Sequence, residues 1–424
     1  MHRLKVISGH VSPYEKNAVQ EQVILNLCRG HPKSPADYFD FDDMLTEKEV
    51  QTRYKVRQFM EKTVQPIMCK FVEEGQFPFH VLPELYNIGV HGDIFDDEAT
   101  STMERAVILM EMARVDASFA IMWMVHSAIG LMGIKLCGSE EQKKKYLPSL
   151  SRYESIAAFA LTEPTVGSDA SNILTTATKT NNGWLLNGEK KWIGNASHNA
   201  IIVVWAKNNT NGQINGFVVQ NNKNVKVEGL TVKVISEKIS LRSVQNCHIT
   251  FSNVFVSEED RLPLATDFRT GPSKVLAFSR LFTGIIPIGM CMSVYESSLK
   301  YLKDREQFGV KLASFQLVQS KLVQILANTQ NMFLLAYRGI QLMDKGKITH
   351  GQTSLIKSQN TKLGRECVAL ARELFGGNGI DRKYGVATHF VDMEAIYTLE
   401  GTFDANILIV GREITGQSAI KKGK

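Results

Sequence analysis

Apolar positions along the chain follow a helical period in two separate stretches. The first covers residues 45–155, and within it residues 103–136 present a long apolar face. The second covers residues 266–424 and ends with a helix after Thr402. Its three long apolar segments lie at residues 273–305, 315–345 and 353–374. The pattern predicts a helical region at each end of the chain.

Between these stretches the pattern changes to short apolar runs separated by turn signals. Asn181-Asn-Gly183 and Asn187-Gly188 are turn sequences typical of hairpins. The strand-like runs are residues 184–186, 201–205, 216–219, 249–251 and 254–256. We therefore predict an α+β chain, with an N-terminal extension, an N-terminal α domain, a central β domain and a C-terminal α domain at residues 1–44, 45–155, 156–265 and 266–424.

Composition limits the function classes. The chain has 424 residues, which favours two or three domains. The net charge of +6 is mild, and no basic run is interleaved with aromatic residues, so we expect no nucleic-acid partner. No uninterrupted apolar run is long enough for us to predict a membrane span. The 6 cysteines are scattered without a C-x-x-C pair, which indicates neither a zinc site nor disulfides and favours a reducing compartment.

The N-terminal segment has two interpretations. It contains Arg3 and Lys5 and no acid before Pro13, as in a mitochondrial presequence, although it has only one arginine. Arg3-Leu4, five residues and His10-Val11 also resemble the N-terminal peroxisomal targeting nonapeptide, from which Val11 departs. The last residues are not a Ser-Lys-Leu signal. We expect a peroxisomal protein, with the mitochondrial matrix as the alternative.

Candidate chemistry centres on Glu400 in Tyr397-Thr-Leu-Glu-Gly-Thr-Phe-Asp404. By spacing alone, the simpler interpretation is a solvated acid at a helix start, with Thr398 or Thr402 as the cap. The alternative is a catalytic carboxylate, and the other motifs of the chain bear on that choice.

Four further motifs are candidates for ligand contacts. Leu161-Thr-Glu-Pro-Thr-Val-Gly-Ser-Asp169 is either a capped turn or a cradle of hydroxyls and N–H groups for a polar ring and a pyrophosphate. Glu189-Lys-Lys-Trp-Ile-Gly-Asn195 contains Trp192, which by itself predicts a core residue. Arg305-Glu-Gln-Phe-Gly309 joins a cation to an aromatic ring, and Leu374-Phe-Gly-Gly-Asn-Gly379 allows close backbone approach.

Together and in this order, the five motifs resemble the acyl-CoA dehydrogenase family over residues 45–416. Within it the chain is most similar to the glutaryl-CoA-dehydrogenase-like branch, which includes plant short-chain peroxisomal acyl-CoA oxidases. The resemblance implies an acyl-CoA dehydrogenase-like fold with an N-terminal helical domain, a central β domain and a C-terminal four-helix bundle domain. It also implies a homotetramer, or a homodimer, with FAD between the β and C-terminal domains and reaching into a neighbouring subunit.

The resemblance implies roles for individual residues. Leu161 and Thr162 would contact the flavin ring, Trp192 would shield one of its faces, and Gly194 would lie at its edge. Ser168 would contact the pyrophosphate or the substrate. The remaining cofactor contacts would be Arg305, Phe308 and Gln316 on the adenine half of FAD from the partner subunit, Gly376 and Gly377 over the pyrophosphate, and Thr402 and Asp404 beside the cofactor. Ala120, Met122 and Gly401 would join Ser168 at the acyl-CoA substrate. No metal site is implied.

Glu400 matches the catalytic base of the family. Removal of an α-proton from a thioester needs a base in contact with it and stabilisation of the developing enolate. An apolar pocket would raise the pKa of Glu400 above its reference of about 4.3. The resemblance implies that the thioester carbonyl oxygen accepts hydrogen bonds from the backbone N–H of the base and from a ribityl hydroxyl of the flavin.

The chain departs from the family pattern at three places. Gly194 replaces the usual threonine and favours oxygen as electron acceptor. Ala120 replaces the arginine of glutaryl-specific members, so we expect a plain saturated acyl chain, because an unpaired buried carboxylate costs roughly 3–5 kcal/mol. Bulky Met122 and Trp123 favour a short chain or are simply core residues. The usual Gly-Tyr-Gly loop is replaced by residues 92–98, which are acidic and leave the pocket depth open.

The sequence therefore predicts FAD-dependent oxidation of a short saturated acyl-CoA to trans-2-enoyl-CoA in fatty-acid β-oxidation, with oxygen as acceptor. One alternative is a dehydrogenase that passes electrons to an electron-transferring flavoprotein. Another is a non-catalytic homologue acting as an assembly factor, which the intact Glu400 and Thr162/Ser168 positions disfavour.

Overall fold

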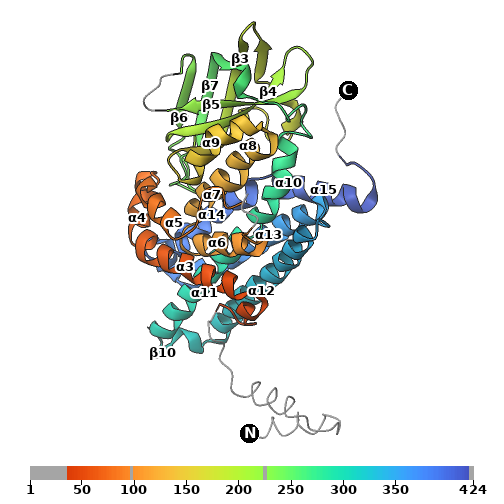
Figure 1. The fold of residues 1–424 in the computed structure, drawn as a ribbon. Helices are drawn as coiled ribbons and strands as arrows, with labels where there is room; N and C mark the ends of the chain where they lie inside the picture. The colour runs from red at the N-terminus through yellow and green to blue at the C-terminus, as the bar shows by residue number, and fades with distance from the viewer. Residues whose placement is uncertain (1–35, 96–98, 223–226, 420–424) are drawn as a thin grey trace.

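The computed structural model describes residues 36–95, 99–222 and 227–419. Figure 1 shows a β domain at one end of the molecule and two sets of helices below it. The order of the chain is helical, then β, then helical, so the predicted α+β class is confirmed. The N-terminal extension lies largely outside the described residues, as do the candidate targeting residues Arg3 to Val11.

The N-terminal helices are α3 to α9. Asp116 ends α6 and caps α7 by accepting a hydrogen bond from the Phe119 N–H, with a distance of 2.8 Å. The prediction of one helix over residues 103–136 is therefore wrong, because the capping carboxylate competes for backbone donors. The bounds are α3 Glu47–Phe59, α4 Gln65–Glu74, α5 Leu82–Asn87, α6 Thr102–Val115, α7 Ala117–Met124, α8 Leu131–Cys137 and α9 Glu140–Ser151, with π-helical turns at Met60–Val64 and Val125–Gly130.

A buried ionic network joins α3 to α6. Glu111 on α6 is 0% exposed and accepts from Arg53 at 2.9 Å and from Arg57 at 2.8 Å. Burial would raise the pKa of Glu111, but the arginines reverse the effect and hold it below its usual value. Removing one partner would leave an uncompensated buried charge, so the network fixes how these helices pack.

The β domain is an eight-stranded sheet with the order β6-β7-β3-β2-β4-β5-β8, and β1 pairs with β4 in parallel. Four of its strands contain the predicted runs, whereas β1, β2, β6 and β8 were not predicted. Short strands give little periodic signal. The bounds are β1 Ile156–Ala160, β2 Thr176–Lys179, β3 Gly183–Ile193, β4 Ala200–Asn208, β5 Ile214–Asn221, β6 Leu230–Val234, β7 Cys247–Ser257 and β8 Arg261–Leu262.

The C-terminal helices pack around α13, which contacts α10, α11, α12, α14 and α15. The predicted helix over residues 273–305 is broken after Thr283, where Gly284 lets α10 approach the Lys357 backbone closely. The bounds are α10 Pro272–Thr283, α11 Ile286–Asp304, α12 Gln316–Asp344, α13 His350–Leu374, α14 Val386–Thr398 and α15 Phe403–Thr415, with a small hairpin of β9 Glu306–Gln307 and β10 Val310–Lys311.

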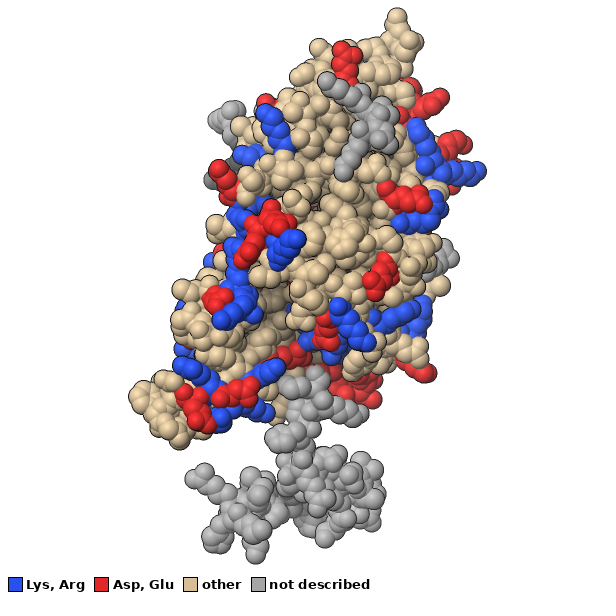
Figure 2. All heavy atoms as spheres, turned by 90° about the vertical axis from the view of Figure 1, so that its left-hand side faces the viewer, with Lys and Arg blue, Asp and Glu red and all other residues tan. Residues whose placement is uncertain are grey.

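Two helical stretches of the described chain, Ala117–Cys137 and Pro272–Asp304, are long and apolar enough to cross a membrane by length and composition alone. Their most apolar windows are 94% and 78% buried within the fold. Packing in the core thus accounts for their composition. Charges of both signs are interspersed on the face drawn in Figure 2, as the mild net charge suggested.

Candidate active site

Glu400 lies in the turn between α14 and α15, and it is not part of either helix. Its φ of 56° is left-handed, and Gly401 follows with a φ of 95°. Thr402 is the cap of α15, since its hydroxyl accepts from the Ala405 N–H at 3.2 Å. A left-handed conformation costs a non-glycine residue about 1–2 kcal/mol and persists only where surrounding contacts impose it.

The Glu400 carboxylate points at α10. Its Oε2 accepts a hydrogen bond of 2.9 Å from the Ser279 hydroxyl, and the Arg280 Nε lies 3.5 Å from the Glu400 carbonyl oxygen. Burial raises the pKa of Glu400 above its usual value, while the Ser279 hydrogen bond and the charges of Arg280 and Lys357 oppose that rise. The carboxylate is thus a stronger base than a solvated one, yet it is kept ionisable.

Replacing Ser279 with alanine should shift the acid limb of the kcat/KM profile to higher pH. The hydroxyl stabilises the charged carboxylate, so its loss favours the protonated form and raises the pKa of Glu400. The expected shift of the acid limb is upward, because only the opposing hydrogen bond is removed. Ser298→Ala is the matched control, because the Ser298 hydroxyl is buried on α11 and has no hydrogen-bond partner among the described residues. An unchanged limb in Ser279→Ala would contradict the assignment.

A buried ion pair fixes the loop of residues 161–169. Lys190 is 0% exposed, and its ammonium donates to the Leu161 carbonyl oxygen and to Glu163, each at 2.9 Å. Glu163 also accepts from two backbone N–H groups, those of Leu174 at 2.6 Å and Thr175 at 2.8 Å. Burial lowers the pKa of Lys190 to about 8. These buried contacts therefore fix the loop that carries Thr162 and the exposed Ser168.

Trp192 is 52% exposed, so its interpretation as a core residue is wrong. It lies at an irregularity of β3 with a φ of 65°, which turns the indole out of the sheet. Gly194 follows, and a side chain there would meet its nearest neighbours, Val244 and Val125, at 3.7 and 3.8 Å. Gly194 itself is buried, so of these two residues it is the exposed Trp192 ring that offers a surface to a bound ring system.

Asn195 ties this strand end to the helix that holds two predicted substrate contacts. Its amide donates to the Met122 carbonyl oxygen at 3.0 Å and to that of Ala157 at 3.2 Å. Ala120 and Met122 are both buried on α7, which packs against α14. The fold therefore brings the β3 end, α7 and the helix before Glu400 into one region.

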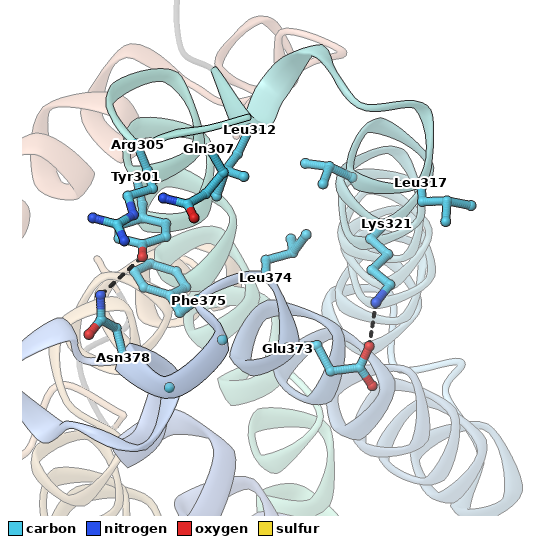
Figure 3. Close-up of a pocket in the computed structure, with 13 residues that line it drawn as sticks. Tyr301, Arg305, Gln307, Leu312, Leu317, Lys321, Glu373, Leu374, Phe375 and Asn378 are labelled. Atoms are coloured by element: carbon cyan, nitrogen blue, oxygen red, sulfur yellow. Dashed lines mark hydrogen bonds and ion pairs between the residues drawn. The ribbon is translucent and has the colours of Figure 1, made fainter. Parts of the chain in front are cut away.

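A second group of predicted residues lies elsewhere. Arg305, Gly376 and Gly377 line one cavity of about 440 Å³, where Tyr301 stacks on Phe375 with ring centres 4.2 Å apart (Figure 3). In the described part of the chain, no atom outside their own neighbours lies within 4 Å of a β-carbon placed at either glycine, so their backbones are open to a ligand. The cavity lies beside the β9–β10 hairpin, at the end of the molecule opposite the β domain (Figure 1).

The remaining predicted cofactor residues are exposed. Phe308 is 94% exposed with a φ of 55°, and Gln316 opens α12; neither lines the cavity. Asp404 is exposed in the first turn of α15. Within one chain, the structure thus does not bring the Arg305 group together with Thr162 and Trp192. Among the described residues, no cluster of three or more histidine, cysteine or acidic side chains could hold a metal ion.

Several site residues escaped the sequence interpretation, namely Ser279, Arg280, Lys357 and the pair Glu163 and Lys190. Strand alternation offered one signal, because it must turn one of Lys190 and Lys191 inward. Lys357 lies one turn from Thr353 and Thr361, which are also buried, so a polar stripe on α13 could have marked it. Ser279 carried no such signal.

Comparison with known proteins identifies three domain models along the chain. The N-terminal, middle and C-terminal domains of acyl-CoA dehydrogenase match residues 46–154, 158–254 and 272–415. Together they account for most of the described chain.

Individual relatives are similar along nearly their whole lengths. An acyl-CoA dehydrogenase from Bacillus subtilis is 27% identical over 88% of this chain and 99% of its own length. The mitochondrial short/branched chain specific acyl-CoA dehydrogenase of Bos taurus is 26% identical over 97% of this chain and 94% of its own length.

Solved structures of glutaryl-CoA dehydrogenase from Mycobacterium smegmatis share the fold, and one of them is in complex with FADH2. The first superposes with a TM-score of 0.87 and 30% identity, covering 92% of this chain and 100% of that one. Since the three domain models cover well over half of its residues, the chain belongs to the acyl-CoA dehydrogenase family, whose members are FAD-dependent oxidoreductases.

Proposed function

We propose that the protein oxidises a short saturated acyl-CoA to trans-2-enoyl-CoA, with Glu400 as the base that removes the α-proton. The observation that carries this proposal is Glu400, which is partly buried, has a left-handed backbone and accepts a hydrogen bond of 2.9 Å from the Ser279 hydroxyl at its carboxylate. A raised pKa brings a carboxylate nearer to the operating pH, which is where general bases are most effective.

The residues present fit FAD. The Thr162 loop offers a hydroxyl and backbone groups held by a buried ion pair, and Trp192 offers an exposed ring. The 440 Å³ cavity has an exposed arginine and two open glycines, which suit a phosphate-bearing nucleotide. When bound, FAD accepts the β-hydrogen as a hydride. Product formation from butyryl-CoA by purified protein tests the activity, and its absence would reject it.

We also propose a homotetramer, or at least a homodimer, in which the two groups of cofactor residues come from different subunits. The Arg305 cavity lies beside the β9–β10 hairpin, at the end of the molecule away from the β domain that carries Trp192, and its lining includes neither Trp192 nor Thr162 (Figure 1). Exposed apolar side chains on the helical domain, including Leu317 at 80% and Val323 at 64%, supply surface for subunit contact.

A short acyl chain is favoured by an aromatic cluster on the helix of Ser279. Phe282 follows Ser279 by three residues and lies on the same face of α10. It packs against Phe95 with ring centres 4.7 Å apart, and Phe95 packs against Trp123 at 5.4 Å. Trp123 is locked by its hydrogen bond of 3.0 Å to the Tyr153 hydroxyl. We infer that these rings limit the space available to an acyl chain, and α7 has no cation for a glutaryl carboxylate.

Replacing Phe95 with alanine should move the preferred substrate to a longer acyl chain. Removing the ring opens space within the cluster formed with Phe282 and Trp123, and each added methylene that is buried contributes about 0.8 kcal/mol. The ratio of kcat/KM for octanoyl-CoA to that for butyryl-CoA should rise about tenfold or more. Phe333→Ala is the control, since Phe333 is a buried phenylalanine stacked on Phe41. A ratio that changes equally in both variants would contradict the assignment.

Oxygen is the acceptor that we propose, on the strength of Gly194. A β-carbon at this position would meet its neighbours at ordinary van der Waals distances of 3.7–3.9 Å, so it causes no clash. The protein should form hydrogen peroxide with butyryl-CoA under air. Gly194→Thr should reduce peroxide formation while anaerobic flavin reduction persists. No peroxide from the unaltered protein would reject the oxidase, and turnover with an electron-transferring flavoprotein would then identify the dehydrogenase.

For the compartment we propose the peroxisome, on the strength of Arg3-Leu4 and His10-Val11 in the sequence. A fluorescent fusion that keeps this N-terminal segment free should colocalise with a peroxisomal marker. Colocalisation with mitochondria would favour the presequence interpretation instead.

A further inference from the structure

The ammonium of Lys357 is buried next to the turn that carries Glu400. The side chain comes from the middle of α13 and is 0% exposed. Its Nζ donates to the Tyr397 carbonyl oxygen at 2.8 Å and to the Gly401 carbonyl oxygen at 2.7 Å. A buried ammonium is costly unless it is hydrogen-bonded or paired, so its presence here needs a reason.

These two acceptors lie on either side of Glu400. Tyr397 is in the last turn of α14, where carbonyl groups lack helical partners and cations are favourable. Gly401 directly follows Glu400 and has a φ of 95°. Lys357 therefore connects both ends of the left-handed turn to α13. This helix is neither α14, which precedes the turn, nor α15, which follows it.

The Gly401 carbonyl oxygen has a second, uncharged donor. The Asn406 amide reaches it at 2.9 Å and the Thr402 carbonyl oxygen at 3.0 Å. Asn406 is also 0% exposed. The Gly401 carbonyl oxygen is thus held by one charged and one neutral side chain, which allows geometry and charge to be separated by mutation.

We propose that Lys357 is a positioning residue for the catalytic base: it clamps the turn in the conformation that presents Glu400, and its charge favours the ionised carboxylate. This inference rests on the proposed function of Glu400. A purely structural clamp would need only the two hydrogen bonds, whereas the proposed role also needs the positive charge.

The electrostatic environment supports the proposed effect of the Lys357 charge on the Glu400 carboxylate. Burial lowers the pKa of Lys357 to about 8, which leaves the ammonium charged at neutral pH. The charged groups that act on it are Glu400, from the turn, and Arg280, from α10. In turn, Lys357 and Arg280 oppose the rise in the pKa of Glu400 that burial causes. Removing the ammonium should therefore raise that pKa and leave less ionised base at a given pH.

The experiment compares Lys357→Met, Lys357→Gln and Asn406→Leu with the unaltered holoprotein. Three quantities are measured for each: the pH profile of kcat/KM with butyryl-CoA, deuterium incorporation from solvent at the substrate α-carbon, and the melting temperature. Lys357→Met should lose about a hundredfold in turnover through misplacement of the base. Its acid limb should move up by about one pH unit. Lys357→Gln keeps a donor without the charge, so it should recover turnover in part while the limb stays shifted.

Asn406→Leu should lower turnover and deuterium incorporation without moving the limb, because it removes a donor but no charge. The proposal is overturned if both Lys357 variants keep the unaltered limb, or if Asn406→Leu shifts it equally. If Lys357→Met does not fold, Lys357→Gln decides the question. If the unaltered protein neither oxidises butyryl-CoA nor exchanges its α-protons, the proposed function fails; a failure confined to the Lys357 variants leaves that function intact.

Discussion

Glu400→Gln should bind flavin normally and lose nearly all turnover of butyryl-CoA. Glutamine is close in shape and can still accept a hydrogen bond from Ser279, so the turn and the cofactor contacts should persist. It cannot take a proton, and general-base catalysis contributes about 10²–10⁴-fold. A loss of at least about a thousandfold in kcat is therefore expected, measured as enoyl product formed per flavin.

Glu394→Gln is the matched control for this variant. Glu394 lies on α14, six residues before the base, in an exposed ion pair with Arg365 at 2.8 Å. Such pairs contribute about 0–1 kcal/mol, so activity should stay close to that of the unaltered protein. Turnover by Glu400→Gln at the unaltered rate would end the assignment of the base.

Lys190→Met should destabilise the β domain and release flavin. It leaves Glu163, which is 4% exposed, without its counter-charge, and breaking a buried pair in this way costs about 3–5 kcal/mol. The Leu161 carbonyl oxygen loses its donor in the same step, so the loop of Thr162 should lose its fixed conformation. The melting temperature should fall by several degrees, and the flavin-to-protein ratio after gel filtration should drop severalfold.

Two further variants make this test specific. Lys179→Met removes a lysine from an exposed pair with Glu258 in the same domain, and it should change neither quantity appreciably. In Lys190→Met/Glu163→Gln the orphaned charge is gone, so part of the stability should return. If Lys190→Met keeps its flavin and its melting temperature, the buried pair does not hold the loop.

The helical and strand pattern predicted the architecture because periodic burial is a local property of sequence. The pattern gave a wrong prediction where a single cap or a single backbone conformation determined the structure. Asp116 divides the helix predicted over residues 103–136, since its carboxylate caps a new helix start. Trp192 was expected in the core on hydrophobicity, but its left-handed backbone at a strand irregularity turns the ring outward. Neither effect changes the apolar period.

The candidate site was predictable only in part, for a different reason. Glu400 and the Thr162 loop lie in motifs that are contiguous in the sequence. Ser279 is 121 residues from Glu400 in sequence, and Lys357 reaches the same turn from a third helix. Such contacts depend on how α10, α13 and α14 pack, and no local pattern encodes that arrangement. The separation of the Arg305 cavity from Thr162 and Trp192 likewise required the three-dimensional structure.

The central claim is that Glu400 removes the α-proton of an acyl-CoA, so that the substrate can reduce a bound flavin. Anaerobic addition of butyryl-CoA to the purified holoprotein, followed by the visible flavin absorbance, tests it most directly. The account predicts rapid bleaching in the unaltered protein and in Glu394→Gln, and a flavin that stays oxidised in Glu400→Gln. A flavin that no acyl-CoA bleaches in the unaltered protein, or equal bleaching in Glu400→Gln, would contradict it.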